Sequence, residues 1–178
     1  MADDTAHDAA SDNIFAARPD LGEAMFALNR ALKARRQLPD RLVELIRLRV
    51  AYRNQCRPCM SVRYEDALAD GLTETLVCAL ERPEEAADLS PAEKAAVAYA
   101  DRFATDHLAI DRQREALKNH FTTAQIAEIA VNVAFFVGFG RMGAVFDDGV
   151  PLPVGARRDD GELLAPWRLQ GERLTAPA

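Results

Sequence analysis

The sequence predicts an all-α protein, a helical bundle that continues into an extended C-terminal arm. Much of its apolar content of 49% is Ala and Leu, whereas aromatic residues make up only 7% of the chain. This balance favours helix over sheet. Apolar residues recur at three- and four-residue spacing in successive segments, as on the buried face of a helix. Helix-start signals precede two of these segments, at Ser90 and Thr122.

Composition divides the chain into a tail, one domain and an arm. Residues 1–13 are acidic, Ala-rich and without a pattern, and we expect a disordered tail. Residues 14–146 are expected to form a single helical domain, long enough to bury a core. Residues 147–178 contain several Pro and Gly and have neither a helical nor a strand period. We expect an extended arm there that wraps a surface, such as that of a neighbouring subunit, and we predict no strand.

The first three helices follow from periodicity and from helix-breaking residues. One helix is predicted from Pro19 to about Arg36. The second, from about Asp40 to Arg53, carries apolar residues around nearly its whole circumference and should therefore be central. Asn54-Gln55 breaks this pattern. The third helix is predicted to begin around Cys56 to Pro58 and to end at Gly71, a residue suited to a C-terminal cap.

The second half of the domain is also helical. A short helix is predicted from Thr73 to about Leu80, followed by a linker from Glu81 to Leu89. Ser90-Pro91-Ala92-Glu93 has the pattern of a capping box, and its helix should reach about Thr105. Another helix spans Asp111 to Asn119. The last and longest begins at Thr122 and runs through about Phe146.

The charge balance and the apolar runs exclude some classes of partner. The chain has 22 Lys and Arg against 28 Asp and Glu, a net charge of −6. Because no basic face dominates, we expect neither nucleic acid nor an anionic membrane as a partner. The longest apolar run, Ile126 to Phe139, is shorter than the ~18 residues of a membrane helix and contains Glu128 and Asn132. The N-terminus lacks the regions of a signal peptide, so we expect a cytoplasmic protein.

Cys56 and Cys59 form the Cys-x-x-Cys pair that carries most of the functional signal. Three cysteines in a reducing compartment argue against a structural disulfide framework. At the predicted helix start the two thiols share a face, and a helix start favours the thiolate. A thiolate can attack a peroxide or a disulfide, after which its neighbour closes the pair. Metal binding and simple burial are the alternatives. Zinc needs four ligands, and His107 and His120 lie in other segments.

Glu44 precedes the pair by twelve positions, on the predicted central helix. It shares an apolar stripe with Leu48 and Ala51, so its carboxyl group should be partly desolvated and suited to proton exchange near neutral pH. The alternative is an ordinary salt bridge to Arg41 or Arg47, one turn to either side.

Arg63 follows Cys59 by four positions, hence on the same face of the predicted third helix. A cation there would stabilise a Cys59 thiolate. It cannot relay protons, because guanidinium does not deprotonate near neutral pH. The alternative is a solvated arginine or a partner for Glu44 or Asp66.

Three other features are expected to serve packing. Cys78 lies in the apolar run Leu76–Leu80 and should belong to the core. The last helix carries three phenylalanines expected in the core or an interface, and three glycines that would let it approach a neighbour closely. These are Phe135, Phe136 and Phe139, and Gly138, Gly140 and Gly143.

The spacing Glu-x11-Cys-x2-Cys, with Ala67 and Gly71 following, resembles the alkyl hydroperoxidase D-like branch of the carboxymuconolactone decarboxylase family. The stretch RLRVAYRNQCRPC is similar to that family's LxVAxxNxCxYC, and AEIAVNVAFFVGFGRMGAVF is similar to its closing helix. The resemblance covers about Leu21 to Phe146 in layout, and its specific motif covers Glu44 to Gly71.

This resemblance implies an all-α, AhpD-like bundle of orthogonal and antiparallel helices, trimeric or hexameric, with the cysteine pair lining an apolar pocket. It implies an antioxidant thiol-dependent peroxidase and disulfide reductase without a cofactor beyond the disulfide. The substrate would be a peroxide or small disulfide, and the reductant a protein or small thiol. Cys59 would become the sulfenic acid, Cys56 would resolve it, and Glu44 would join the proton relay. Helix-end reasoning alone instead marks Cys56 as the more exposed and more acidic thiol.

Arg63 departs from the family pattern, which has a histidine at this position. Either Glu44 acts alone through water, or Arg63 holds the thiolate. Two rival functions stay open. One is action on a lactone or carboxylated ring, with Arg63 binding the carboxylate, although the decarboxylases generally do not rely on a Cys-x-x-Cys. The other is a non-enzymatic redox-sensing oligomer whose disulfide changes its assembly.

Overall fold

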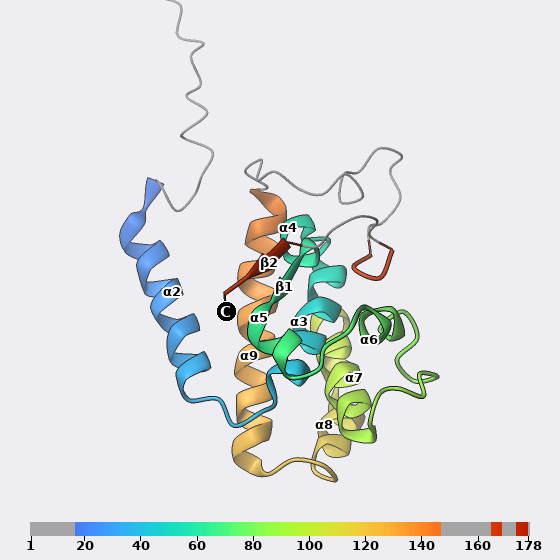
Figure 1. Cartoon of the computed structure of the whole chain (residues 1–178). Coiled ribbons are helices and arrows are strands. Elements are labelled where there is room, and N and C mark those ends of the chain that lie inside the picture. The colour runs from blue at the N-terminus through green and yellow to red at the C-terminus, as the bar shows by residue number, and fades with distance from the viewer. Residues whose placement is uncertain (1–16, 147–164, 169–173, 178) are drawn as a thin grey trace, which may run out of the picture. The chain divides into compact units, whose positions relative to one another are not determined.

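The computed structural model describes residues 17–146, 165–168 and 174–177 (Figure 1). The chain divides into two compact units, residues 1–36 and 37–178. The first unit contains α2 (Pro19–Ala34), which begins where the sequence predicts, with Pro19 in its first turn. Every other described element belongs to the second unit.

Among the described residues the fold is all-α, as predicted, except for one pair of three-residue strands. Strand β1 (Val62–Tyr64) pairs in parallel with β2 (Leu174–Ala176), and Val62 lies opposite Leu174. The prediction that the chain contains no strand was therefore wrong. Strands this short show no readable alternation, and their partners are far apart in the sequence.

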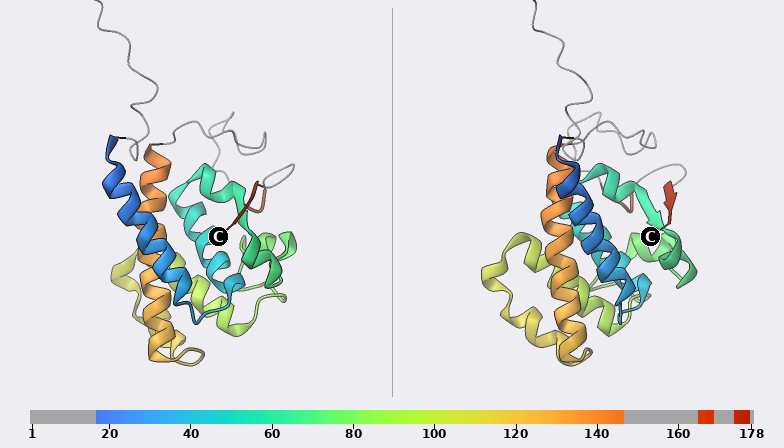
Figure 2. Two further views of the ribbon diagram at one scale, coloured as in Figure 1. Left: turned by 60° about the vertical axis from the view of Figure 1, so that its left-hand side comes forward. Right: turned by 90° about the vertical axis from the view of Figure 1, so that its left-hand side faces the viewer.

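Helix α3 (Asp40–Asn54) is the central helix, as its apolar circumference predicts. Val43, Ile46 and Val50 pack into a core cluster with residues of α7 and α9. Leu45 and Leu48 point into a second cluster, built with residues from Ala67 to Leu89 and Val97. Figure 2 shows α3 accordingly between α9 on one side and α5 and α6 on the other.

The long helices end and begin at the predicted signals. Helix α7 (Pro91–Thr105) starts at a complete capping box between Ser90 and Glu93. A second box, between Thr122 and Gln125, starts α9 (Thr123–Val145). Between them lie α8 (Asp111–Leu117) and a single 3₁₀ turn, His107–Ala109, which the sequence did not predict.

The helix predicted from Cys56 to Gly71 is two short helices separated by β1. Helix α4 (Arg57–Ser61) has five residues, and α5 (Glu65–Ala69) follows the strand. In a continuous helix the Met60 carbonyl would accept from the backbone N–H of residue 64. Here it accepts from Nη1 of Arg63 at 2.8 Å, so a buried side chain takes the place of the helical bond. Gly71 (φ +85°) still follows the end of α5, as expected, and α6 (Glu74–Ala79) begins after Thr73.

Helix α9 approaches α3 closely at its glycines. A Cβ atom on Gly140 would lie 2.6 Å from Nδ2 of Asn54, and one on Gly143 would lie 3.6 Å from Sγ of Cys56. A Cβ atom on Gly138 would meet nothing within 4 Å. The predicted close approach of α9 to a neighbour is therefore confirmed at Gly140 and Gly143. Phe136, one of the three phenylalanines, packs against the core.

Helix α9 is long and apolar enough to cross a membrane, judged by length and composition alone. It is the one such helix in the described part of the chain. The core helix of a soluble protein passes the same test. Its polar side chains bind within the fold: Glu128 accepts from the backbone N–H of Gln37 at 3.0 Å, and Asn132 is buried. The sequence predicts an apolar run too short for a membrane helix, because Glu128 and Asn132 interrupt the run.

Candidate active site

Cys56 and Cys59 are joined in a disulfide at the junction of α3 and α4, with Cα atoms 5.2 Å apart. Gln55, in the left-handed conformation (φ 54°), ends α3 and turns the chain, and Cys56 then caps α4. The backbone N–H of Cys59 points at Sγ of Cys56, 3.4 Å away. The two cysteines of the predicted pair therefore lie within a single helical turn, close enough for their sulfurs to form a bond.

The two sulfurs differ in their access to solvent. Cys56 is completely buried, at 0% exposure, and its Sγ faces the side of α9 left open by Gly143. Cys59 is half-buried and packs against Ala51 and Met60. The helix-end expectation that Cys56 is the more exposed thiol was wrong, because the capping position turns its side chain toward α9.

Glu44 is buried in α3, at 3% exposure, as its apolar stripe predicts. Both of its carboxylate oxygens accept from Arg47: Oε2 from Nε and Oε1 from Nη2, each at 2.6 Å. The carboxyl group is thus both desolvated and held in a two-point ion pair, which combines the two interpretations that the sequence left open.

Arg47 connects Glu44 to the cysteine turn. Its Nη1 donates to the carbonyl of Cys59 at 2.6 Å and its Nη2 donates to the carbonyl of Val62 at 2.9 Å. The guanidinium lies over the ring of Tyr64, 4.9 Å from the centroid. Burial disfavours its cationic form, but the Glu44 carboxylate outweighs burial and raises the pKa of Arg47 above its ordinary value.

Sequence reasoning considered Arg47 only as a salt-bridge partner and missed its contact with the cysteine turn. The available signal was a cation one turn from Glu44 on a helix that is apolar on nearly every side. A cation buried in such a helix needs buried acceptors, as Arg47 does here.

Arg63 does not lie on the face of Cys59, because the helix that would align them is broken at β1. Its guanidinium, only 1% exposed, donates to Glu74 at 2.8 Å and to the carbonyl of Pro166 at 3.3 Å, besides Met60. Burial lowers the pKa of Arg63 below its ordinary value, with Glu74 opposing the effect. The predicted position of Arg63 was therefore wrong.

Cys78 is exposed and is not part of the core, contrary to the prediction. Helix α6 buries Leu76 and Val77 along one face. The helical turn places Cys78 on the opposite side, where its Sγ lies 3.7 Å from the carbonyl of Trp167.

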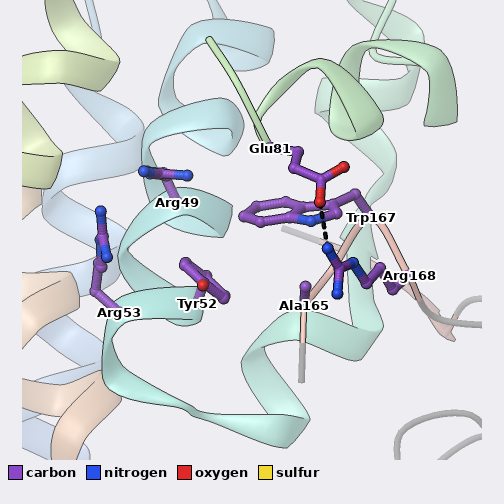
Figure 3. Close-up of a pocket in the computed structure, with 7 residues that line it drawn as sticks. All are labelled: Arg49, Tyr52, Arg53, Glu81, Ala165, Trp167 and Arg168. Atoms are coloured by element: carbon purple, nitrogen blue, oxygen red, sulfur yellow. Dashed lines mark hydrogen bonds and ion pairs between the residues drawn. The ribbon is translucent and has the colours of Figure 1, made fainter. Parts of the chain in front are cut away.

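A pocket of about 370 Å³ lies between α3 and the described part of the C-terminal arm (Figure 3). The rings of Tyr52 and Trp167 are in contact at its centre, with centroids 4.7 Å apart and planes inclined by 49°. On one side Arg49 and Arg53 bind Asp101, and on the other Arg168 binds Glu81, so each cation has an acid within the chain. The lining residues are Arg49, Tyr52, Arg53, Glu81, Ala165, Trp167 and Arg168.

The Arg168–Glu81 ion pair and the contact between Tyr52 and Trp167 make the pocket an anchor for the arm on its own chain. Its polar wall differs from the apolar, cysteine-lined pocket expected from the resemblance, and neither Cys56 nor Cys59 lines it. Tyr52 nevertheless links the two places, because it packs in the same small cluster as Cys59. Within residues 17–146, 165–168 and 174–177, no three His, Cys, Asp or Glu side chains gather as metal ligands would.

The fold and the site define a helical protein with a bonded vicinal cysteine pair beside a buried ion pair. The model of the Carboxymuconolactone decarboxylase family matches residues 19–102 of this chain. This stretch contains the motif from Glu44 to Gly71, and it confirms the family resemblance read from that motif.

Two solved structures share the AhpD-like fold. A protein of unknown function from Agrobacterium tumefaciens, described as a candidate antioxidant defence protein AhpD, superposes with a TM-score of 0.68 at 24% identity. The match covers 79% of this chain and 97% of that one. An uncharacterised peroxidase-related protein from Ralstonia eutropha JMP134, with an alkylhydroperoxidase AhpD core, gives 0.60 at 24% identity. That match covers 88% of this chain and 80% of the other.

Two uncharacterised proteins of Mycobacterium tuberculosis, from strains CDC 1551 / Oshkosh and H37Rv, are similar in sequence. Each is 34% identical over 117 residues, which is 64% of this chain and 41% of the relative. The match therefore spans about two fifths of the length of these curated relatives.

Proposed function

We propose that the protein is a thiol-dependent peroxidase or disulfide oxidoreductase that acts through Cys56 and Cys59. The observation that carries this proposal is the bonded pair itself, with one sulfur half-buried and the other fully enclosed. The AhpD-like fold, and the antioxidant and peroxidase-related descriptions of its two structural neighbours, support the same chemistry.

The exposure of the two sulfurs supports Cys59 as the attacking residue. Its thiolate attacks one oxygen of a hydroperoxide, so that an S–O bond forms, the O–O bond breaks and the alkoxide leaves as an alcohol with one proton. Sulfur supplies the two electrons and becomes a sulfenic acid. The Cys56 thiol then attacks this sulfur, the disulfide forms, and the hydroxyl group leaves as water. A dithiol, small or protein-borne, reduces the disulfide and is itself oxidised to a disulfide.

Glu44 is the proposed proton carrier. The family's histidine is absent, so proton transfer between Cys59 and the leaving oxygen would run through Glu44 and water. Each carboxylate oxygen accepts one N–H from Arg47 and retains a further lone pair for such a bond.

The remaining parts of the proposal concern partners and location. We propose that no cofactor beyond the disulfide takes part and that the protein is cytoplasmic. A homo-oligomer, trimeric or hexameric, would cover the apolar side chains that α9 leaves exposed, such as Val131 and Val145, the latter 76% exposed.

Peroxide consumption with matched cysteine variants tests the proposal. In stopped-flow mixing of the reduced protein with hydrogen peroxide or an organic hydroperoxide, Cys59→Ser should abolish consumption. Cys56→Ser should allow sulfenic acid to form but no disulfide, as read by mass spectrometry. Cys78→Ser, an exposed thiol outside the pair, is the control and should react as the wild type does. Consumption that persists at the wild-type rate in Cys59→Ser would exclude the proposal.

The rival function with a carboxylated substrate loses its binding residue in this structure. Arg63 is fully buried, and its guanidinium is bonded to Glu74 and to backbone carbonyls. That rival predicts turnover that survives thiol alkylation, and the redox-sensing rival predicts a change of sedimentation on oxidation without turnover.

A further inference from the structure

We propose that Arg47 sets the reactivity of Cys59: its guanidinium supplies the positive charge beside the thiolate and fixes the backbone of the cysteine turn. The role of Arg47 in catalysis rests on the proposed function, whereas the effect of Arg47 on the Cys59 thiol does not. Arg47 is thus a positioning residue, which acts on the peroxide through Cys59.

The first observation is the direct contact with the cysteine turn. Nη1 of Arg47 lies 2.6 Å from the carbonyl oxygen of Cys59. Standard bond lengths keep the carbonyl oxygen and Sγ of one residue within roughly 5 Å of each other. The cation therefore lies within roughly 8 Å of Sγ, close enough to stabilise a thiolate in a poorly solvated site.

The second observation is that two cations from neighbouring elements are engaged elsewhere. Arg63, from β1, binds Glu74 and the Met60 carbonyl, and Arg141, from α9, binds Asn54 and the Ala104 carbonyl. The charged and titratable groups near the turn on the surrounding elements are Glu44, Arg47, Tyr52 and Arg53 on α3, Arg57 on α4, Arg63 and Tyr64 on β1, and Arg141 on α9. Tyr52 is neutral near pH 7, and Arg53 binds Asp101.

The third observation is the buried counter-charge. Glu44 holds Arg47 by two bonds of 2.6 Å, so Arg47 keeps one rotamer and one distance from the turn. Arg47 is bonded directly to the Cys59 carbonyl, whereas Glu44 is bonded to Arg47, so we expect the cation to dominate the field at the sulfur. Removing the charge of Arg47 should therefore make Cys59 ionise at a higher pH, and removing the charge of Glu44 should make it ionise at a lower pH.

The test follows the alkylation of Cys59 by iodoacetamide against pH, in the reduced full-length protein carrying Cys56→Ser and Cys78→Ser. Arg47→Gln should raise the midpoint pH of alkylation by about one unit, and Glu44→Gln should lower it. Arg47→Lys keeps the charge and should restore most of the wild-type midpoint. Arg41→Gln is the matched control, because Arg41 lies on the same helix but pairs with Glu93, 2.6 Å away. It should leave the midpoint unchanged.

A second comparison covers the case in which Arg47→Gln does not fold, since it leaves a buried carboxylate unpaired. Glu44→Gln/Arg47→Gln leaves no buried charge, and its midpoint should lie about one unit above that of Glu44→Gln. Midpoints that agree within about 0.2 unit in these comparisons would overturn the inference, because a merely structural Arg47 would not move them. No peroxide is present in this assay, so a shifted midpoint in a protein without peroxidase activity refutes the proposed function alone.

Discussion

Replacing Gly140 with alanine should destabilise the fold, whereas the same change at Gly138, two residues earlier on α9, should not. The new Cβ at position 140 would lie 2.6 Å from Nδ2 of Asn54, which is closer than any relaxed contact. Asn54 cannot yield freely, because it is buried and bonded on both sides. Its Nδ2 donates to the carbonyl of Phe136 at 2.9 Å, and its Oδ1 accepts from Nε of Arg141 at 3.1 Å.

The expected size of the effect follows from these contacts. Overpacking a tight site costs about 1–3 kcal/mol. Displacing the Asn54 amide breaks two hydrogen bonds, at about 1 kcal/mol each, and alanine in a helix interior returns about 1 kcal/mol relative to glycine. We expect Gly140→Ala to lower the free energy of unfolding by about 2–4 kcal/mol. Gly138→Ala, with nothing within 4 Å, should raise it by up to about 1 kcal/mol.

Urea unfolding followed by circular dichroism measures both variants at one protein concentration, so that any oligomer contributes equally. The cycle with Asn54→Ala isolates the contact: in that background Gly140→Ala should cost nothing. Equal stability of the Gly138 and Gly140 variants, or an unchanged penalty after Asn54→Ala, would refute the reasoning.

Three further outcomes are expected. Burial opposes ionisation of Glu93, but hydrogen bonds from Ser90 and an arginine ion pair outweigh it and hold the pKa of Glu93 below its ordinary value of 4.5. Its stabilising effect is therefore complete above that value and is lost as the pH falls through the folded value, and Glu93→Gln should flatten the acid limb of stability against pH. Mass spectrometry of the native oxidised protein after iodoacetamide should show label on Cys78 alone. Tyr52→Leu should loosen the arm, read as increased acrylamide quenching of Trp167, the only tryptophan.

Local signals predicted most of this fold, and long-range pairing accounts for what they missed. The Ser90 and Thr122 boxes and the apolar circumference of α3 are each encoded within a few neighbouring residues, and each was found as expected. The break after Ser61 was not, because β1 exists through its pairing with β2 at the far end of the chain. Nothing in the sequence around Arg63 reports that partner.

The candidate site likewise combines features that local sequence predicts with features that depend on distant segments. Cys-x-x-Cys spacing is a local property, and it predicted a pair able to bond. Which sulfur is exposed depends on α9, whose Gly143 lies against Cys56. Which cation serves Cys59 depends on where the chain bends, and the bend directs Arg63 away and leaves Arg47 in contact.

The replacement of the family's histidine by Arg63 can be understood from the arm. Position 63 lies in the strand that pairs with β2, and its side chain also binds the carbonyl of Pro166 within the arm. An imidazole has two ring nitrogens and could not reach Glu74, Met60 and Pro166 together, as the five N–H groups of a guanidinium can. Arg63 therefore serves to dock the arm. A cation near Cys59 would still stabilise the thiolate of the proposed chemistry, and Arg47, bonded to the Cys59 carbonyl, is placed to do so from the preceding helix.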